Sequence, residues 1–242
     1  MGTPYQPRTY RADRGGEDLV AWRITLAETD LHIQAERKLH ELSLTAAREA
    51  RAQVEQEMAR QPEFATSLHP LPAREAAPPV VAGMYAAAAC AGVGPLAAVA
   101  GAIAHYVGEA LETESGQVIV ENGGDIFLHT ACERLVGIVA GRSPFSGKVA
   151  LVMVPGTRCG VCTSSGILGH SYSMGRADAA VVVAPDAALA DAAATGLGNR
   201  VLRPEDAEEA VNWALTVPGV SGALVICGMA LAAGGEVALR RL

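Results

Sequence analysis

Residues 160–199 read GVCTSSGILGHSYSMGRADAAVVVAPDAALADAAATGLGN and combine strand and helix signals with most of the candidate chemistry of the chain. Their first part predicts a glycine-bounded turn that carries a thiol, three hydroxyl groups and an imidazole. A short apolar strand at 179–184 and a helix at 187–198 follow, and the helix carries a carboxylate and a hydroxyl group four positions apart. Because structural segments rarely need so many polar groups between two apolar ones, we expect the functional site here.

The rest of the chain predicts strands and helices without regular βαβ alternation, which favours an α+β fold with a largely antiparallel sheet packed with helices. Alternating or β-branched runs predict strands, and Ala-rich or amphipathic runs predict helices. The predicted strands are 20–27 with 31–35 as a hairpin, 118–121, 126–129, 135–139 and 149–154, and a closing hairpin of 223–229 with 236–239. The other predicted helices are 42–60, 83–91, 96–111 and 204–215.

Length and charge limit the function classes. The 242 residues suit a single domain over 1–242, or two tightly joined lobes with a Pro-rich connector at 67–79. The net charge of −7 argues against nucleic-acid binding, which needs a dense basic face, but permits a phosphate-bearing small ligand. The uncharged run at 76–104 is mostly Ala and Gly and is interrupted by three prolines, so we expect buried helix and loop, and no membrane span.

The start of the chain and its cysteines indicate a compartment. Residues 1–18 are polar and mixed in charge and contain no secretory signal. The chain has five cysteines, an odd number, and most of them lie in apolar segments, which suits a reducing environment better than a disulfide scaffold. We therefore expect a cytoplasmic location.

Asp191 and Thr195 lie four positions apart in the predicted helix, so their oxygen atoms face the same way. Two hard oxygen donors on one helix face suit Mg²⁺, which takes few protein ligands and leaves positions for phosphates. The structural alternative for Asp191 is an ordinary buried polar contact. Asp186, just before the helix, is better explained as its N-cap.

Asn122, Gly123, Gly124 and Asp125 lie between two predicted strands. They predict either a plain hairpin turn or a turn against which a ligand lies, with a carboxylate beside it, and the residues alone do not decide between these. Residues 92–97 match the G-x-G-x-x-A pattern of dinucleotide-binding proteins. They follow helix-forming residues rather than a strand, so we interpret them as a tight helix–helix turn.

Thr163, Ser164, Ser165 and Gly166 offer hydroxyl groups and backbone amides that could hold a phosphate or an adenine edge. A hydrogen-bonded Ser/Thr turn explains the same residues. His170, four positions later, is a candidate general acid or base, although a lone histidine is more often structural.

Cys162 is a second candidate catalytic residue. The predicted Gly- and hydroxyl-rich turn would lower the pKa of its thiol, and Cys159 is close enough in sequence to resolve it. The C-x-x-C spacing alone is a weak signal.

Motifs along nearly the whole chain resemble, in the right order, the uncharacterised family called UPF0280. They are Thr9-Tyr10-Arg11, ETDL at 28–31, GVGP at 92–95, VENGGDI at 120–126, CTSSG at 162–166, GRAD at 175–178, ADAAAT at 190–195 and GN at 198–199. That family is similar to the ApbE flavin transferases, which cleave FAD in the presence of Mg²⁺ and attach FMN through a phosphoester to a Thr or Ser of a target protein. The resemblance implies an ApbE-like, T-fold-like architecture.

The resemblance also implies roles where the motifs align. The metal-binding pattern Ala-Asp-x-x-Ala-Thr falls on Asp191 and Thr195, and the Gly-Gly-Asp turn that lies against the flavin nucleotide falls on 123–125. The Thr-Ser-Gly turn falls on 164–166, and the histidine after it falls on His170. The implied cofactors are Mg²⁺ and FAD, and the implied partners are a small-molecule nucleotide and a protein acceptor. A homo-oligomer is left open.

The chain also departs from the ApbE pattern, because residues 171–176 read SYSMGR where ApbE proteins have Ile-Ile-Asp-Pro-Arg-Thr-Gly. Three hypotheses follow. The first is an ApbE-like Mg²⁺-dependent enzyme in which His170 moves a proton at the attacking hydroxyl group. The second is a cysteine-persulfide protein of sulfide assimilation towards homocysteine, with which the family has been associated. The third is a flavin-binding protein without turnover.

Overall fold

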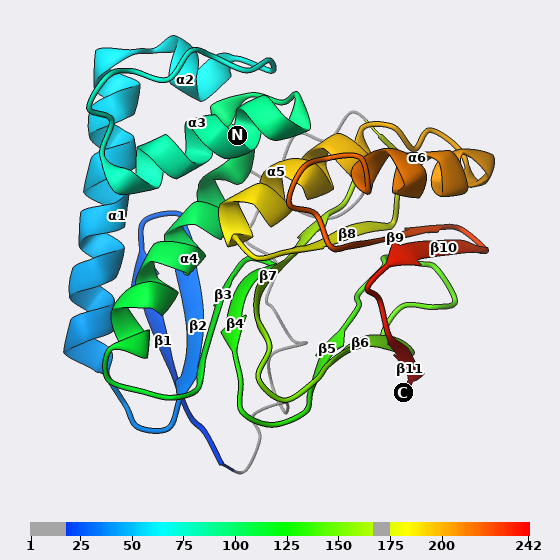
Figure 1. Ribbon diagram of the computed structural model, residues 1–242, viewed down its shortest axis with the longest axis horizontal. Helices are drawn as coiled ribbons and strands as arrows, with labels where there is room; N and C mark the ends of the chain where they lie inside the picture. Colours follow the sequence, from blue (N-terminus) through cyan, green and yellow to red (C-terminus); the bar gives the residue numbers. More distant parts are fainter. Residues whose placement is uncertain (1–17, 167–174) are drawn as a thin grey trace.

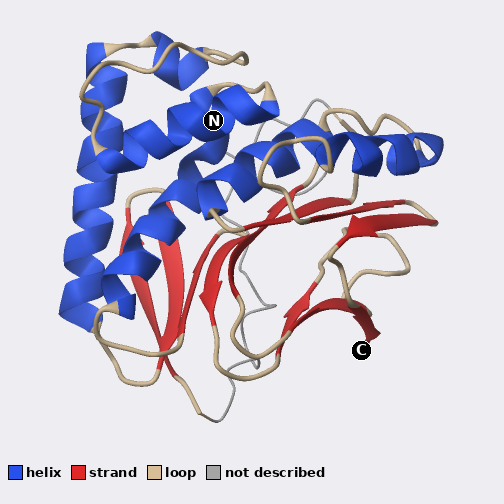
Figure 2. Ribbon diagram, viewed as in Figure 1, coloured by secondary structure: helices blue, strands red, loops and turns tan. Residues whose placement is uncertain are grey.

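The computed structural model describes residues 18–166 and 175–242, in which one large sheet is covered by helices on one face (Figure 1). A small sheet lies on the other face (Figure 2). Apolar side chains therefore pack against both faces of the large sheet. All neighbouring strands in both sheets are antiparallel. The expected α+β class with an antiparallel sheet packed with helices is therefore confirmed.

The large sheet nearly follows the order of the chain, β1-β2-β3-β4-β7-β8-β9-β10. Its strands are β1 (Val20–Leu26), β2 (Thr29–Ala35), β3 (Val118–Asn122), β4 (Asp125–His129), β7 (Arg158–Ser164), β8 (Ala179–Ala184), β9 (Gly222–Cys227) and β10 (Ala230–Gly235). The predicted turn at the start of the 160–199 stretch is wrong as far as Ser164, because these residues form β7. Strand β7 is held by partners on both sides: Val161 lies opposite Ile126 of β4 and Val183 of β8.

The small sheet has the order β11-β6-β5 and corrects the predicted closing hairpin. Its strands are β5 (Arg134–Gly137), β6 (Val149–Met153) and β11 (Leu239–Arg241). Strand β9 pairs with β10 and not with 236–239, because β10 follows β9 directly and Ala230 lies opposite Cys227. Residues 239–241 instead pair with β6 on the other face of the large sheet. The Ala and Gly residues of β10 gave only a weak strand signal.

The helical layer contains the predicted helices. They are α1 (His40–Arg60), α3 (Pro79–Ala91), α4 (Val99–Glu112), α5 (Ala187–Gly198) and α6 (Ala207–Ala214), with the short elements α2 (Glu63–Thr66), η2 (Pro95–Ala98) and η3 (Pro204–Asp206). Helix α5 lies at the centre and packs against β7, β8, α3 and α4. Ten of its twelve residues are buried, and Ala predominates among them, so neighbouring backbones can approach it closely.

The segment at 92–97 is a helix–helix turn, as predicted. Gly92 caps α3 in the left-handed conformation with φ +69°, which favours glycine. A Cβ on Gly94 would lie 1.7 Å from the carbonyl oxygen of Ser67, so this turn packs tightly on the 67–79 connector.

Within the described residues, no single helix is long and apolar enough to cross a membrane. Only α3 together with Pro95–Glu112 has the required length and composition, and these two segments are bent by 108° relative to each other.

Candidate functional site

Three of the polar residues that the sequence singles out come together where the first turn of α4 lies between α5 and the turn joining β3 to β4. Asp191 of α5 and Asn122 of β3 both hydrogen-bond to this first turn of α4. Asp125, at the start of β4, bonds to β7 beside them. We call Asn122, Asp125 and Asp191 the carboxylate site.

Asp191 is buried, and its Oδ2 accepts a hydrogen bond of 2.9 Å from the amide of Gly101. The first amides of a helix have no partner within that helix, and Ala98, which precedes α4, has no polar side chain, so the carboxylate of Asp191 serves as the acceptor. Glycine is required at 101 because a Cβ there would lie 2.1 Å from the carbonyl oxygen of Ala187 and 2.7 Å from the Cβ of Asp191. The buried polar contact considered for Asp191 is therefore present, and its partner is backbone.

Gly123 and Gly124 form a two-residue hairpin turn in which Asn122 lies opposite Asp125. Both glycines have positive φ angles, +75° and +113°, which side chains disfavour. Asn122 donates from Nδ2 to the carbonyl oxygen of Ala100 at 3.2 Å, which joins the turn to α4. The hairpin turn is thus confirmed, whereas its contact with a ligand stays a prediction. The turn places the buried carboxylate of Asp125 close enough to Asp191 for its charge to act there.

The electrostatics of the carboxylate site are unfavourable without a cation. Burial raises the pKa of Asp191 well above its ordinary value, and the negative charge of Asp125 raises it further, while the amides of Gly101 and Ala100 oppose the shift. Two neighbouring carboxylates in a buried position suit a hard divalent cation, which would favour the charged form of both. The residues present therefore fit the expected metal.

The hydroxyl groups lie along β7 and α5. Ser164 is buried, and its Oγ finds no hydrogen-bond partner among the described residues. Thr195 is half-buried and lies one helical turn beyond Asp191. Ser165 and Gly166 follow β7, where the amide of Gly166 donates to the carbonyl oxygen of Ala177 at 3.0 Å. A buried hydroxyl group without a partner is a polar atom available to a ligand.

Within the described ranges, no group of three or more His, Cys, Asp or Glu side chains is placed to hold a metal ion. A Mg²⁺ ion here would take the carboxylate of Asp191 together with hydroxyl and phosphate oxygens, beside the charge of Asp125, and few protein ligands are typical of this ion. His170 lies outside the described residues. The N-cap role of Asp186 is confirmed, because its Oδ1 accepts from the amides of Ala188 at 2.6 Å and Leu189 at 3.4 Å.

The expected environment of Cys162 is wrong. It lies in β7 rather than on a turn, is fully buried, and donates from Sγ to the carbonyl oxygen of Ala187 at 3.3 Å. Burial raises the pKa of its thiol well above the ordinary value, and the charges of Asp125 and Asp191 add to the effect. Cys159 is three positions away on the same strand, so it faces the opposite core and cannot reach Cys162. The argument for a reactive thiol pair is thereby lost.

We predict that only Cys90 and Cys132 react rapidly with a thiol reagent in the native protein, because these two are exposed. The other three cysteines are buried, and burial raises the pKa of Cys159 to about 11. Titration with Ellman's reagent before and after addition of denaturant measures both groups. A Cys90→Ser, Cys132→Ser double variant should show no fast phase. A fast phase that persisted in it would show that a buried thiol is accessible.

The sequence patterns did not identify two residues that contribute to this region. Gly101 carries a weak signal, since a glycine inside a helix often marks close backbone approach. His105 accepts from the amide of Ala187 at 3.3 Å, a contact between positions 82 apart in the chain, for which local sequence offers no signal.

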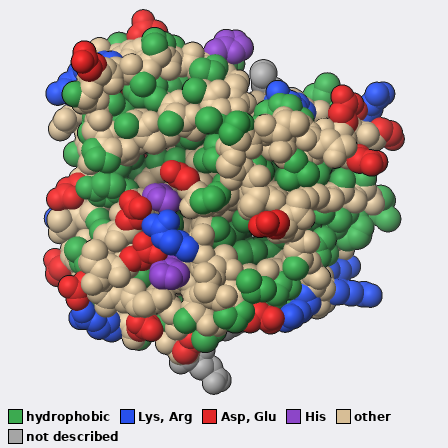
Figure 3. Space-filling view, viewed as in Figure 1, with side chains coloured by type: hydrophobic (Ala, Val, Ile, Leu, Met, Phe, Trp, Pro, Cys, Tyr) green, Lys and Arg blue, Asp and Glu red, His purple; other side chains and the backbone are tan. Residues whose placement is uncertain are grey.

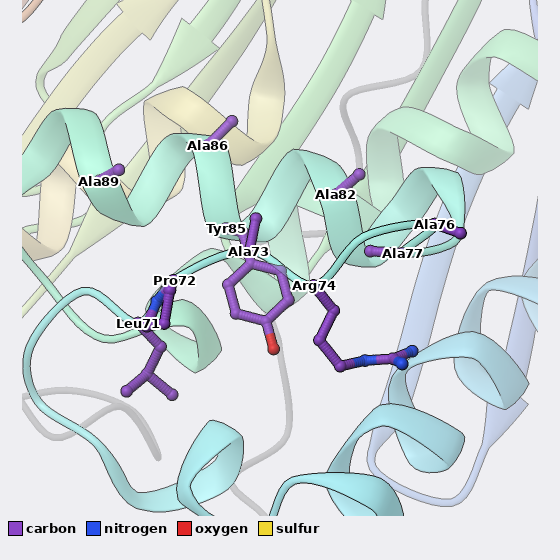
Figure 4. Close-up of a pocket in the computed structure, with 10 residues that line it drawn as sticks. All are labelled: Leu71, Pro72, Ala73, Arg74, Ala76, Ala77, Ala82, Tyr85, Ala86 and Ala89. Atoms are coloured by element: carbon purple, nitrogen blue, oxygen red, sulfur yellow. The ribbon is translucent and has the colours of Figure 1, made fainter.

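A separate pocket of about 470 Å³ lies between α3 and the segment that precedes it (Figure 4). Its lining consists of Leu71, Pro72, Ala73, Arg74, Ala76, Ala77, Ala82, Tyr85, Ala86 and Ala89. The polar groups at its edge already have partners: Arg74 forms an ion pair of 2.9 Å with the buried Glu57, and the Tyr85 hydroxyl donates to the same carboxylate at 2.9 Å. None of the predicted site residues lines this pocket.

Comparisons with known proteins agree over nearly the whole chain. The family model described as AbpE bacteria matches residues 11–238. A UPF0280 protein of Methanocella arvoryzae is 40% identical over 213 residues, which cover 88% of this chain and 87% of that protein. A UPF0280 protein of Methanosarcina acetivorans is 42% identical over 216 residues, with coverage of 88% and 85%.

Solved structures with a similar fold include the flavin transferase ApbE from Vibrio cholerae, with a TM-score of 0.60, 14% identity and coverage of 90% of this chain and 96% of that one. The flavinyl transferase ApbE of Pseudomonas stutzeri gives a TM-score of 0.57 at 12% identity, with coverage of 90% and 94%. At such low identity, the likeness shows a shared fold.

Proposed function

This chain belongs to the UPF0280 proteins and to the family described as AbpE bacteria, and on that premise we propose that it is an ApbE-like flavin transferase that binds FAD with Mg²⁺ at the carboxylate site. The observation that carries the proposal is the buried pair of Asp125 and Asp191 beside a side-chain-free turn. The solved structures that share its fold are described as flavin transferases, which supports the reaction class.

Asp191 and Thr195 would hold the metal, with Asp125 close enough to contribute its charge. When bound, Mg²⁺ would supply a Lewis acid at the pyrophosphate. The protein holds Asp191 in place before the metal arrives, through the amide of Gly101. Fixing a ligand in advance reduces the rearrangement that binding requires.

The nucleotide would lie against the β3–β4 turn and the end of β7. Gly123 and Gly124 present backbone without side chains, and among the described residues only the carbonyl oxygen of Thr163, at 4.0 Å, would meet a Cβ placed on Gly124. A flat ligand can therefore approach this backbone closely. The buried hydroxyl group of Ser164 offers a polar contact nearby.

In the proposed reaction, a hydroxyl oxygen of the protein acceptor forms a bond to the FMN phosphorus. The bond from that phosphorus to the bridging oxygen breaks, and AMP leaves with the electron pair. The hydroxyl proton passes to a base, for which His170 is our candidate. A water molecule in place of the acceptor would give FMN and AMP.

The first measurement is the absorbance spectrum of the purified full chain after incubation with FAD, with and without Mg²⁺, followed by separation from free ligand. We expect retained flavin only with Mg²⁺, and chromatography of the mixture should then show AMP. A Glu133→Gln variant is a matched control, since Glu133 pairs with Arg240 of the small sheet and is remote from the carboxylate site. It should retain flavin as the wild type does.

Each alternative to the transferase predicts a different result of this measurement. Retained flavin with no AMP over hours would indicate a binding protein without turnover and would contradict the transferase. The absence of retained flavin under both conditions would contradict the nucleotide site itself.

A further inference from the structure

His105 contacts α5 one helical turn away from the point where Gly101 contacts Asp191. Gly101 and His105 are four positions apart on α4, and Asp191 and Ala187 are four positions apart on α5. The amide of Gly101 donates to Asp191 at 2.9 Å, and the amide of Ala187 donates to Nδ1 of His105 at 3.3 Å. Two hydrogen bonds in opposite directions thus join the helices at the spacing of one turn.

The amide of Ala187 needs this external acceptor. It is the first amide of α5, and the first amides of a helix have no partner within the helix. The side chain of Asp186 already accepts from the next two amides, those of Ala188 and Leu189. The imidazole of His105 completes the cap. Because Nδ1 accepts here, the ring carries its proton on Nε2, which lies 3.4 Å from Oε1 of Glu109.

The imidazole is also held from its other sides. It packs edge-on against Phe127 with 5.1 Å between the ring centroids, and its side chain is only 16% exposed. Figure 3 shows histidine, basic and acidic side chains gathered in one group on the face in view. Glu109 pairs with Arg158 at 3.2 Å, and Arg158 lies over the ring of Phe127. The ring therefore has little freedom to leave Ala187.

We propose that His105 is a positioning residue that fixes the first turn of α5 and thereby holds Asp191 in the geometry that binds the metal. This inference rests on the proposed function of the carboxylate site. Asp191 is held at the first turn of α4 through the amide of Gly101, and the bond at Ala187 fixes the start of α5 against the same helix one turn away. Outer residues that orient a metal ligand commonly change metal affinity by about 10- to 100-fold when removed.

The test compares three replacements of His105 in the full chain. Asn places its side-chain oxygen near the position of Nδ1, whereas Gln places its amide near the position of Nε2, and Leu removes the acceptor. The readouts are Mn²⁺ affinity, from the electron paramagnetic resonance signal of free Mn²⁺, and hydrogen exchange at Ala187 in metal-free protein. His129→Leu is the matched control, because His129 joins the same surface group through Glu112 at 2.8 Å but belongs to β4.

We expect His105→Leu and His105→Gln to weaken Mn²⁺ binding about tenfold or more and to speed exchange at Ala187. His105→Asn should restore both to within about threefold of the wild type, and His129→Leu should change neither. If the His105→Leu variant did not fold, the comparison of His105→Asn with His105→Gln would test the proposal, because both carry an amide group but at different distances from the backbone.

Equal Mn²⁺ affinity in the wild type and the Gln variant would overturn the inference and leave the proposed function standing. Asn binding as weakly as Gln would also overturn it. A wild-type chain that bound no Mn²⁺ would instead overturn the proposed function, and the inference with it.

Discussion

Replacing Asp191 by Asn should abolish Mg²⁺-dependent retention of FAD and lower the rate of AMP release at least about 100-fold. A metal ion supplies several kcal/mol of charge stabilisation, and about 1.4 kcal/mol corresponds to a factor of ten in rate. The Asn side chain keeps an oxygen that can accept from Gly101, so the fold is retained while the negative charge is lost. The measurement is AMP release by chromatography at saturating Mg²⁺, with Glu133→Gln as the charge-matched control.

Although Asp191→Asn should lower activity, it should raise the free energy of unfolding of the metal-free protein. The pKa of Asp191 is raised above its ordinary 3.8 in the folded state, so the unfolded chain releases this proton at lower pH than the folded chain does. The contribution of Asp191 to stability is therefore fully present below pH 3.8 and is lost as the pH rises through the raised folded value. Asn at position 191 does not ionise, so the variant does not lose this stability as the pH rises.

Thermal unfolding in EDTA between pH 4 and pH 8 measures this second effect. At neutral pH, we expect Asp191→Asn to gain about 1 kcal/mol or more, which is about 2–4 °C in Tm for a chain of this size. Saturating Mg²⁺ should make the wild type the more stable of the two proteins, because a ligand present at 100 times its Kd stabilises the wild type by about 2.7 kcal/mol.

For the activity measurement, an Asp191→Asn variant that still retained FAD only when Mg²⁺ was present would refute the assignment of Asp191.

Gly101→Ala should destabilise the protein by about 3 kcal/mol or more, a fall in Tm on the order of 10 °C. The added Cβ would lie 2.1 Å from the carbonyl oxygen of Ala187, which is backbone and cannot move aside without shifting α5. The shift would also lengthen the hydrogen bond from Gly101 to Asp191, so we expect Mn²⁺ affinity to fall together with stability.

Gly83→Ala is the matched control for this substitution. Gly83 also lies inside a helix, α3, and apart from the backbone of that helix and its chain neighbours, no atom of the described residues lies within 4 Å of the position of its Cβ. Replacing such a glycine by alanine should stabilise the protein by about 0.5–1 kcal/mol. Equal effects of the two substitutions in thermal unfolding would contradict the close contact between α4 and α5.

Sequence patterns predicted the features that depend on neighbouring residues. Helix α5, its cap at Asp186 and the turn at Gly123 and Gly124 all follow from local signals: a run of alanines, an acidic residue before it, and two glycines between alternating strands. The position of Asp191 and Thr195 on one face of α5 could be predicted for the same reason.

The features that were missed depend on distant parts of the chain. Strand β7 has only two β-branched residues, Val161 and Thr163, and its other residues are Arg, Cys, Gly and Ser. It is extended because β4 and β8 flank it. The raised pKa of Cys162 follows from that placement and could not be inferred from its neighbours. The partner of Ala187, His105, lies on another helix, so only the packing of α4 against α5 reveals it.

The order of strands has a consequence for how the chain folds as it is synthesised. In the large sheet, each strand after β1 pairs with one made before it, so this sheet can grow as the chain emerges. The small sheet cannot, because β6 pairs with β11, which is made after every strand of the large sheet. Until then, the hairpin of β5 and β6 has an open edge. Completion of the small sheet is thus a late step, after the strands and helices that carry the carboxylate site have been made.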